Sequence, residues 1–169
     1  MLTKKFLEQI ESYIAINFRE RKPKKKISRP LEPARVTCCV QYMIIAPAGL
    51  ENRLQRLEET FPQYLLNLIA KRGLNEVDVY KRAHLDRRIF SKLRTQKDYM
   101  PRKRTIVAIA FAMELDFDEA QDLLERGGYA LSEYSKEDVI ISFFFENRIY
   151  DFFQLNEVLD HYGFKPLSC

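Results

Sequence analysis

The sequence predicts an all-α fold. Apolar residues recur at helical spacing from Phe61 almost to the end of the chain. Residues that typically start helices, such as Asn75 and Asp86, stand directly before these apolar runs. The 169 residues suit one ordinary domain plus an extension, and a content of 46% hydrophobic and 31% charged residues is normal for a globular protein.

The first predicted element is an amphipathic N-terminal helix within residues 1–20. Thr3 can cap this helix, which we expect to reach about Phe18. One side of it is apolar and comprises Phe6, Leu7, Ile10, Tyr13 and Ile14. Because an isolated helix of this length is marginal in water, we expect this side to pack against the C-terminal domain or against a second copy of the chain.

Residues 21–49 are predicted to form a basic linker followed by a short extended segment. Three prolines and eight Lys or Arg residues crowd residues 19–35, and this composition disfavours a helix. The arm is either a plain tether or a further source of phosphate contacts. Residues 36–47 are apolar and rich in β-branched side chains, which indicates a short strand or a buried extended segment whose role stays open.

The rest of the chain, residues 50–169, is predicted to form one helical domain. A short helix is expected at about 50–57, and a buried helix then runs from Phe61 until Gly73 ends it. A helix-turn-helix follows at about 75–94. Four more helices complete the domain. The first is a central apolar helix from about Arg102, the second starts at Asp118, and the last two lie at about 135–147 and 152–162.

The charge is distributed very unevenly along the sequence. The net charge of the whole chain is +4, but residues 19–35 carry +6 and residues 81–104 carry +8, whereas residues 105–169 carry −9. Concentrated positive charge is typical of proteins that bind polyanions. The alternative is that the first block is a tether and the second an ordinary pair of polar helices.

Membrane and enzyme classes are disfavoured. No apolar run approaches the ~20 residues that a membrane-spanning helix needs, and the first residues lack an apolar signal core, so we expect a cytoplasmic protein. The three cysteines lack the spacing of a disulfide framework or metal site and are expected to be free thiols. The sequence has no Gly-rich phosphate loop, G-x-S-x-G or H-E-x-x-H motif, so no catalytic residue, metal or cofactor is expected.

One stretch of the sequence resembles a known family. The run LDRRIFSKLR is followed by a loop containing proline and by an apolar helix that ends in MEL. In this pattern residues 61–124 resemble the five-helix domain of the Cro and phage-repressor (xenobiotic-response-element) family of helix-turn-helix proteins. Beyond Gly127 the chain resembles the tail of a poorly characterised bacterial helix-turn-helix group.

The resemblance implies a role for each helix of the pair. The second helix of the domain crosses the DNA backbone and the third enters the major groove. Leu85, Phe90 and Leu93 are expected to face the core, and Ile89 to be exposed on the side that faces the groove. The predicted base-reading residues are Arg87, Arg88 and Lys92, and the predicted phosphate contacts are Arg94, Lys97, Arg102, Lys103 and Arg104.

The favoured function is therefore sequence-specific binding of duplex DNA by a homodimeric transcriptional regulator. The main alternative is a non-catalytic protein-interaction module of repressor-like fold in defence or stress signalling. It is suggested by Ile89, by the Phe-rich residues 143–153, and by Gln96, which stands where the family usually has glycine. A third hypothesis is RNA binding or inhibition of a nuclease through the basic arm.

Overall fold

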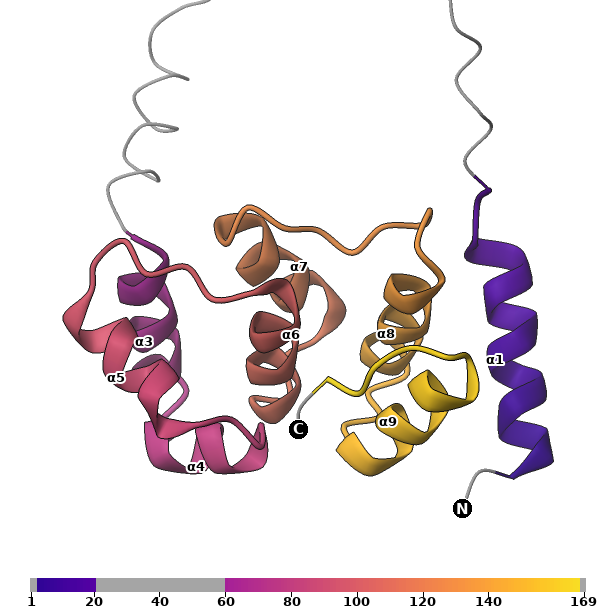
Figure 1. Cartoon of the computed structure of the whole chain (residues 1–169), viewed down its shortest axis with the longest axis horizontal. Helices are drawn as coiled ribbons and strands as arrows, with labels where there is room; N and C mark the ends of the chain where they lie inside the picture. The colour runs from indigo at the N-terminus through magenta and orange to yellow at the C-terminus, as the bar shows by residue number, and fades with distance from the viewer. Residues whose placement is uncertain (1–2, 21–59, 168–169) are drawn as a thin grey trace, which may run out of the picture. The chain divides into compact units, whose positions relative to one another are not determined.

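The computed structural model describes residues 3–20 and 60–167, and these residues form eight α-helices and no strand (Figure 1). The predicted all-α class is confirmed for this part of the chain. The linker, the apolar segment 36–47, the helix at about 50–57 and the three cysteines lie outside the described residues. The helices are α1 (Lys4–Asn17), α3 (Phe61–Lys71), α4 (Glu76–Arg82), α5 (Arg87–Thr95), α6 (Lys103–Ala112), α7 (Phe117–Arg126), α8 (Lys136–Glu146) and α9 (Phe152–His161).

Short polar side chains set the starts of most helices. The carboxylate of Asp86 accepts a hydrogen bond from the backbone N–H of Arg88 (2.8 Å), and the side chain of Asn75 does the same for Val77 (2.9 Å). These bonds satisfy donors that a helix start leaves free. Asp116 caps α7 in a reciprocal pair of bonds with Glu119, so α7 begins at Phe117 and not at the predicted Asp118.

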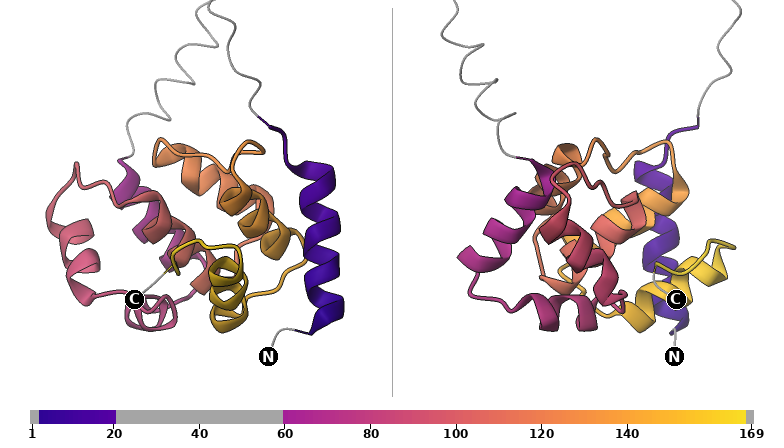
Figure 2. Two further views of the ribbon diagram at one scale, coloured as in Figure 1. Left: turned by 45° about the vertical axis from the view of Figure 1, so that its right-hand side comes forward. Right: turned by 60° about the vertical axis from the view of Figure 1, so that its left-hand side comes forward.

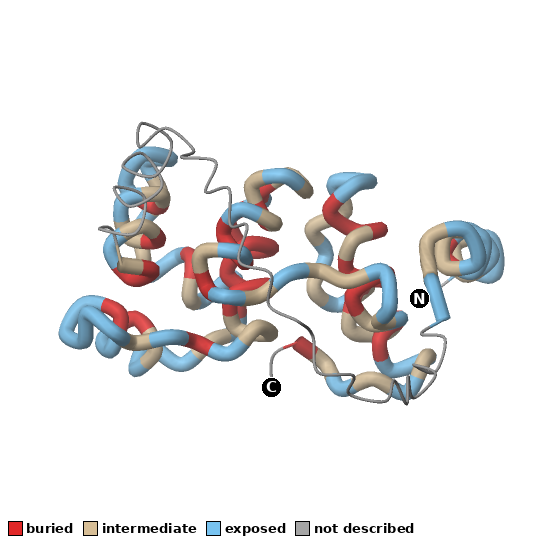
Figure 3. The backbone as a smooth tube through the Cα atoms, turned by 90° about the horizontal axis from the view of Figure 1, so that it is seen from above, coloured by how far each residue is buried: buried red, intermediate tan, exposed pale blue. Residues whose placement is uncertain are grey.

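Helix α6 is the centre of the core. Every residue from Ile106 to Ala112 is buried, and buried residues (red in Figure 3) gather near the middle of the bundle. Helices α4 and α7 both pack against α6. Phe111 contacts the rings of Phe145 (5.6 Å between centroids) and Phe152 (4.9 Å), which come from the last two helices. The predicted central apolar helix is confirmed. Through Phe111, helix α6 also contacts the last two helices of the chain.

Helix α1 packs on α8, as two further views show (Figure 2). Ile10 is fully buried, and the rings of Phe6 and Tyr13 meet Phe143 edge-on at 6.0 and 5.1 Å. The apolar side of α1 is therefore covered by the C-terminal part of the same chain, one of the two partners that the sequence left open. Burial, reinforced by the Glu146 carboxylate nearby, raises the pKa of Tyr13.

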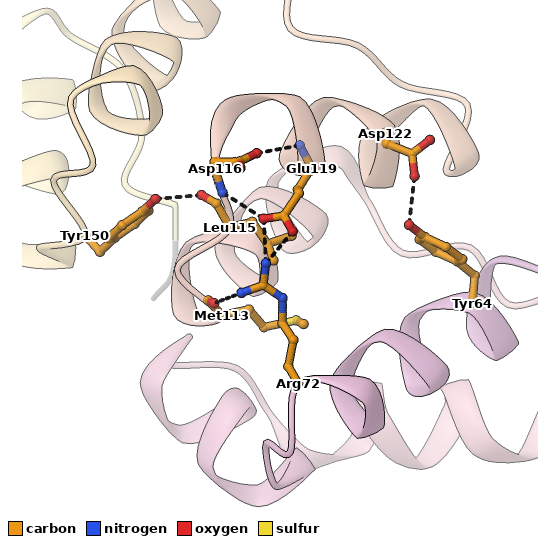
Figure 4. A network of polar contacts seen from close by, with 8 residues as sticks. All are labelled: Tyr64, Arg72, Met113, Leu115, Asp116, Glu119, Asp122 and Tyr150. Atoms are coloured by element: carbon orange, nitrogen blue, oxygen red, sulfur yellow. Dashed lines mark hydrogen bonds and ion pairs between the residues drawn. The ribbon is translucent and has the colours of Figure 1, made fainter.

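A polar network braces α3 against the C-terminal end of α6 and the start of α7 (Figure 4). Arg72 forms an ion pair with Glu119 and donates a hydrogen bond to the carbonyl of Met113 at 3.4 Å. The Tyr64 hydroxyl donates to Asp122 at 2.7 Å, and the Tyr150 hydroxyl donates to the carbonyl of Leu115 at 2.8 Å. These contacts join segments that are distant in sequence, and they hold α3, which precedes α4 and α5, against α7.

None of the helices in residues 3–20 and 60–167 is long and apolar enough to cross a lipid bilayer.

Candidate nucleic-acid interface

Helices α4 and α5 are joined by a tight turn at residues 83–86 (Figure 1). His84 has a positive φ of 51°, a left-handed conformation that reverses the chain, and the N–H of Leu85 donates to the carbonyl of Tyr80 at 2.9 Å. The His84 ring also packs edge-on against Phe152 at 5.6 Å. The turn is thus held both by its backbone and by α9, which fixes the direction in which α5 leaves it.

One side of α5 is anchored in the core. Phe90 and Leu93 are buried, and Leu85 is half-buried against them, as their spacing predicted. The prediction that Ile89 is exposed was wrong, since its side chain is half-buried and packs against the core. Its position on the helix falls beside the buried side, between Leu85 and Leu93.

The opposite side of α5 carries the predicted base-reading residues, and all three are exposed. The Arg88 side chain is 85% exposed, and its contact with Asp86 is long, at 3.9 Å. Arg87 forms no ion pair with any residue that the structure describes. The ammonium of Lys92 lies 5.6 Å from the centre of the Tyr99 ring, a contact that leaves the charge in solvent. Two guanidinium groups and one ammonium group therefore project from a single short helix.

Three of the predicted phosphate-contacting residues are also at the surface. Arg94 is exposed and pairs with Glu76 on α4 at 3.6 Å. Lys97 and Arg102 are exposed in the segment between α5 and α6, and neither forms an ion pair within the described part of the chain. Gln96 ends α5 with φ −118° and ψ 108°, an extended conformation that any residue adopts, so a glycine is not required at this position.

Lys103 and Arg104, the other two predicted phosphate contacts, are turned toward the protein. The Lys103 ammonium lies 2.6 Å from the carboxylate of Asp138, which is only 6% exposed. Arg104 pairs with Glu137 at 2.7 Å and donates to the carbonyls of Lys165 and Pro166 at 2.9 and 3.0 Å. The two side chains join the start of α6 to α8 and the C-terminal segment, so the structure does not support them as phosphate contacts.

The structure also contains a groove that the sequence did not reveal. An open hollow of about 810 Å³ lies between α3, α4 and α5, and we call it the α3–α5 groove. Its apolar lining includes Leu66 of α3, Leu74 of the α3–α4 loop, and Val77 and Tyr80 of α4. Arg87, Arg88 and Arg94 line it from α5, and Glu76 is the acidic residue among them. No local sequence pattern indicates this groove, because three separate helices form it.

In residues 3–20 and 60–167 no three His, Cys, Asp or Glu side chains come together in a way that could hold a metal ion. No protein-family model, curated protein or solved structure matches the chain. The exposed cations of α5 and the helices that hold them are therefore the features of the described residues that bear on function.

Proposed function

We propose that the protein binds duplex DNA by placing α5 in the major groove and that it acts as a dimeric transcriptional regulator. The observation that carries the proposal is the exposure of Arg87, Arg88 and Lys92 on one side of a short helix whose other side is fixed in the core. A fixed helix can present these side chains to base edges without first becoming ordered.

The dimensions and chemistry of α5 suit this role. An α-helix with its side chains is roughly 10–12 Å wide, and the major groove of B-DNA is about 12 Å wide. An arginine can donate two parallel hydrogen bonds to O6 and N7 of guanine, an arrangement worth about 1–3 kcal/mol of discrimination. Arg87 and Arg88 lie in the first turn of α5, the end of a recognition helix that contacts base edges in helix-turn-helix proteins.

The residues around α5 can supply the electrostatic part of binding. Lys97 and Arg102 are exposed beyond the end of α5 and are suited to contact phosphates. We do not assign this role to Lys103 and Arg104, because each already pairs with a carboxylate of α8. Arg94 can take part only if it leaves Glu76, so we expect fewer phosphate contacts than the net charge of +8 in residues 81–104 suggests.

A dimer is part of the proposal because two copies would read paired half-sites, as related recognition units do. One short helix offers few base contacts, and a second copy doubles them. We expect the DNA complex to contain two chains on one duplex. Sedimentation of the complex measures this stoichiometry.

Fluorescence anisotropy with a mixed-sequence duplex at low salt tests the proposal. We expect Arg87→Ala/Arg88→Ala to weaken binding at least about tenfold, because two exposed guanidinium groups leave the interface. The matched control is Lys4→Ala/Lys5→Ala, which removes the same charge from exposed positions of α1 and should bind as wild type does. Absence of wild-type binding, or an equal loss in both variants, contradicts the proposal. Preference for an RNA duplex in competition would favour RNA as the ligand instead.

A further inference from the structure

The α3–α5 groove has a chemistry that DNA alone does not explain. A nucleic-acid backbone presents phosphates and sugars, and arginines suffice to bind it. The groove adds an apolar lining, in which Leu66, Leu74 and Tyr80 are half-buried and Val77 is exposed. An apolar lining beside arginines is complementary to a helix that carries an apolar side chain together with carboxylates.

Helix α9 of the same chain has these properties. Its Leu155, Val158 and Leu159 are buried, so its opposite side faces outward. Phe153 and Asp160 lie on that outward side, about two turns apart, and Phe153 is 68% exposed. The helix contains no Lys or Arg, whereas it contains Glu157 and Asp160 and is capped by Asp151. It therefore combines an exposed aromatic ring with negative charge.

We propose that the outward side of α9 of a second copy docks in the α3–α5 groove. Phe153 enters the apolar lining, and the exposed Asp160 carboxylate lies against Arg87 and Arg88. The volume of about 810 Å³ leaves room for an aromatic side chain and its neighbours. Charge complementarity supports the contact, since Arg87 and Arg88 are exposed on the groove and Asp160 is exposed on the outward side of α9.

This contact has a consequence for DNA binding that rests on the function proposed above. Arg87 and Arg88 line the groove and are also the proposed base-reading residues. A docked α9 would cover them, so self-association through the groove and binding of duplex compete. A high concentration of the protein would then favour association over binding to DNA.

Analytical ultracentrifugation of the full chain at low salt tests the contact in the absence of DNA. We expect the average mass of the wild type to rise with concentration and to fall when salt is added. Arg87→Glu/Arg88→Glu damages the groove, and Phe153→Ala/Asp160→Lys damages the outward side of α9. We expect each variant alone to weaken association at least about tenfold, because each chain lacks one half of the contact.

Mixing the two variants gives the sharpest result. The groove variant still has an intact α9 and the α9 variant still has an intact groove, so an equimolar mixture should reach a higher average mass than either variant reaches alone. Ile16→Ala is the matched control, because Ile16 is an exposed apolar residue of α1. It should associate as wild type does.

The inference is overturned if wild type shows no concentration dependence, if either variant associates as wild type does, or if the mixture reaches no higher average mass than either variant alone. Melting curves establish that both variants are folded, which is expected because all four substituted residues are exposed. The failure of this inference and that of the proposed function are distinguishable. Phe153→Ala/Asp160→Lys should bind duplex normally in dilute solution, whereas loss of DNA binding by wild type would leave the association data unchanged.

Discussion

Replacing Lys103 with methionine tests whether this residue supports the fold instead of binding phosphate. Methionine retains much of the length of the lysine side chain and removes its charge. The Asp138 carboxylate would then keep one hydrogen bond from the Ser132 N–H at 3.1 Å and lose the ammonium that lies 2.6 Å away. A buried carboxylate without a counter-charge lowers the free energy of unfolding, because the charge has lost its hydration and nothing compensates for it.

The magnitude follows from the burial of the two partners. Removing one member of a fully buried ion pair costs about 3–5 kcal/mol. The Lys103 side chain is 28% exposed, so water partly replaces it, and we expect a loss of roughly 2–3 kcal/mol. For a chain of this size the melting temperature should fall by about 5–10 °C.

Thermal and urea unfolding measure the effect. Lys103→Met/Asp138→Asn should recover at least about half of the loss, because the amide has no charge to desolvate and can still accept from Ser132. Lys97→Met is the matched control, since this exposed lysine should change stability by no more than about 0.5 kcal/mol.

If Lys103→Met changes stability no more than Lys97→Met does, Lys103 does not stabilise the fold through Asp138. A larger loss in Lys103→Met/Asp138→Asn than in Lys103→Met would contradict this role equally. At a temperature where the variant is folded, Lys103→Met should bind duplex as wild type does, because its ammonium is already engaged by Asp138. A loss of affinity comparable to that of Arg87→Ala/Arg88→Ala would restore Lys103 as a phosphate contact.

Two further predictions concern α1 and α5. Burial and the nearby Glu146 carboxylate raise the pKa of Tyr13, so the folded state keeps this proton at a pH where the unfolded chain loses it. Stability from this group is fully present below the ordinary tyrosine pKa of about 10 and is lost as pH rises above it. In melting curves at increasing alkaline pH, Tyr13→Phe should lose less stability than wild type, and equal losses would contradict the assignment. Asp86→Ala removes the cap of α5 and should cost about 1 kcal/mol in urea unfolding, whereas Asp86→Asn should cost less because it still accepts from Arg88; equal costs would refute a capping role.

The local structure of α5 was predictable because nearby residues determine it. Asp86 marks its start, and the spacing of Leu85, Phe90 and Leu93 identifies the buried side. Ile89 was misassigned because it lies at the edge of that side, where the packing of neighbouring helices decides the exposure. The extended backbone at Gln96 likewise follows from the path of the chain toward α6 and not from a local signal.

The contacts of Lys103 and Arg104 could not be predicted from local patterns. Asp138 is 35 residues away from Lys103 along the chain, and Lys165 is 61 residues away from Arg104. Because these cations are close together in sequence, they were expected to share one surface. In the fold, those of α5 are exposed, whereas Lys103 and Arg104 pair with carboxylates of α8. The sequence also left the packing partner of α1 open. An apolar side predicts that another element covers the helix, but it does not identify that element as α8.

The most direct test of the central claim is an NMR titration of the isotopically labelled protein with a short DNA duplex. We expect the amide signals of residues 86–92 to shift or broaden first, together with those of the segment around Lys97 and Arg102. The signals of α8 should move little, because its cationic neighbours Lys103 and Arg104 are bound to its own carboxylates. Unchanged α5 signals in the presence of saturating duplex, or shifts confined to other helices, would contradict the account.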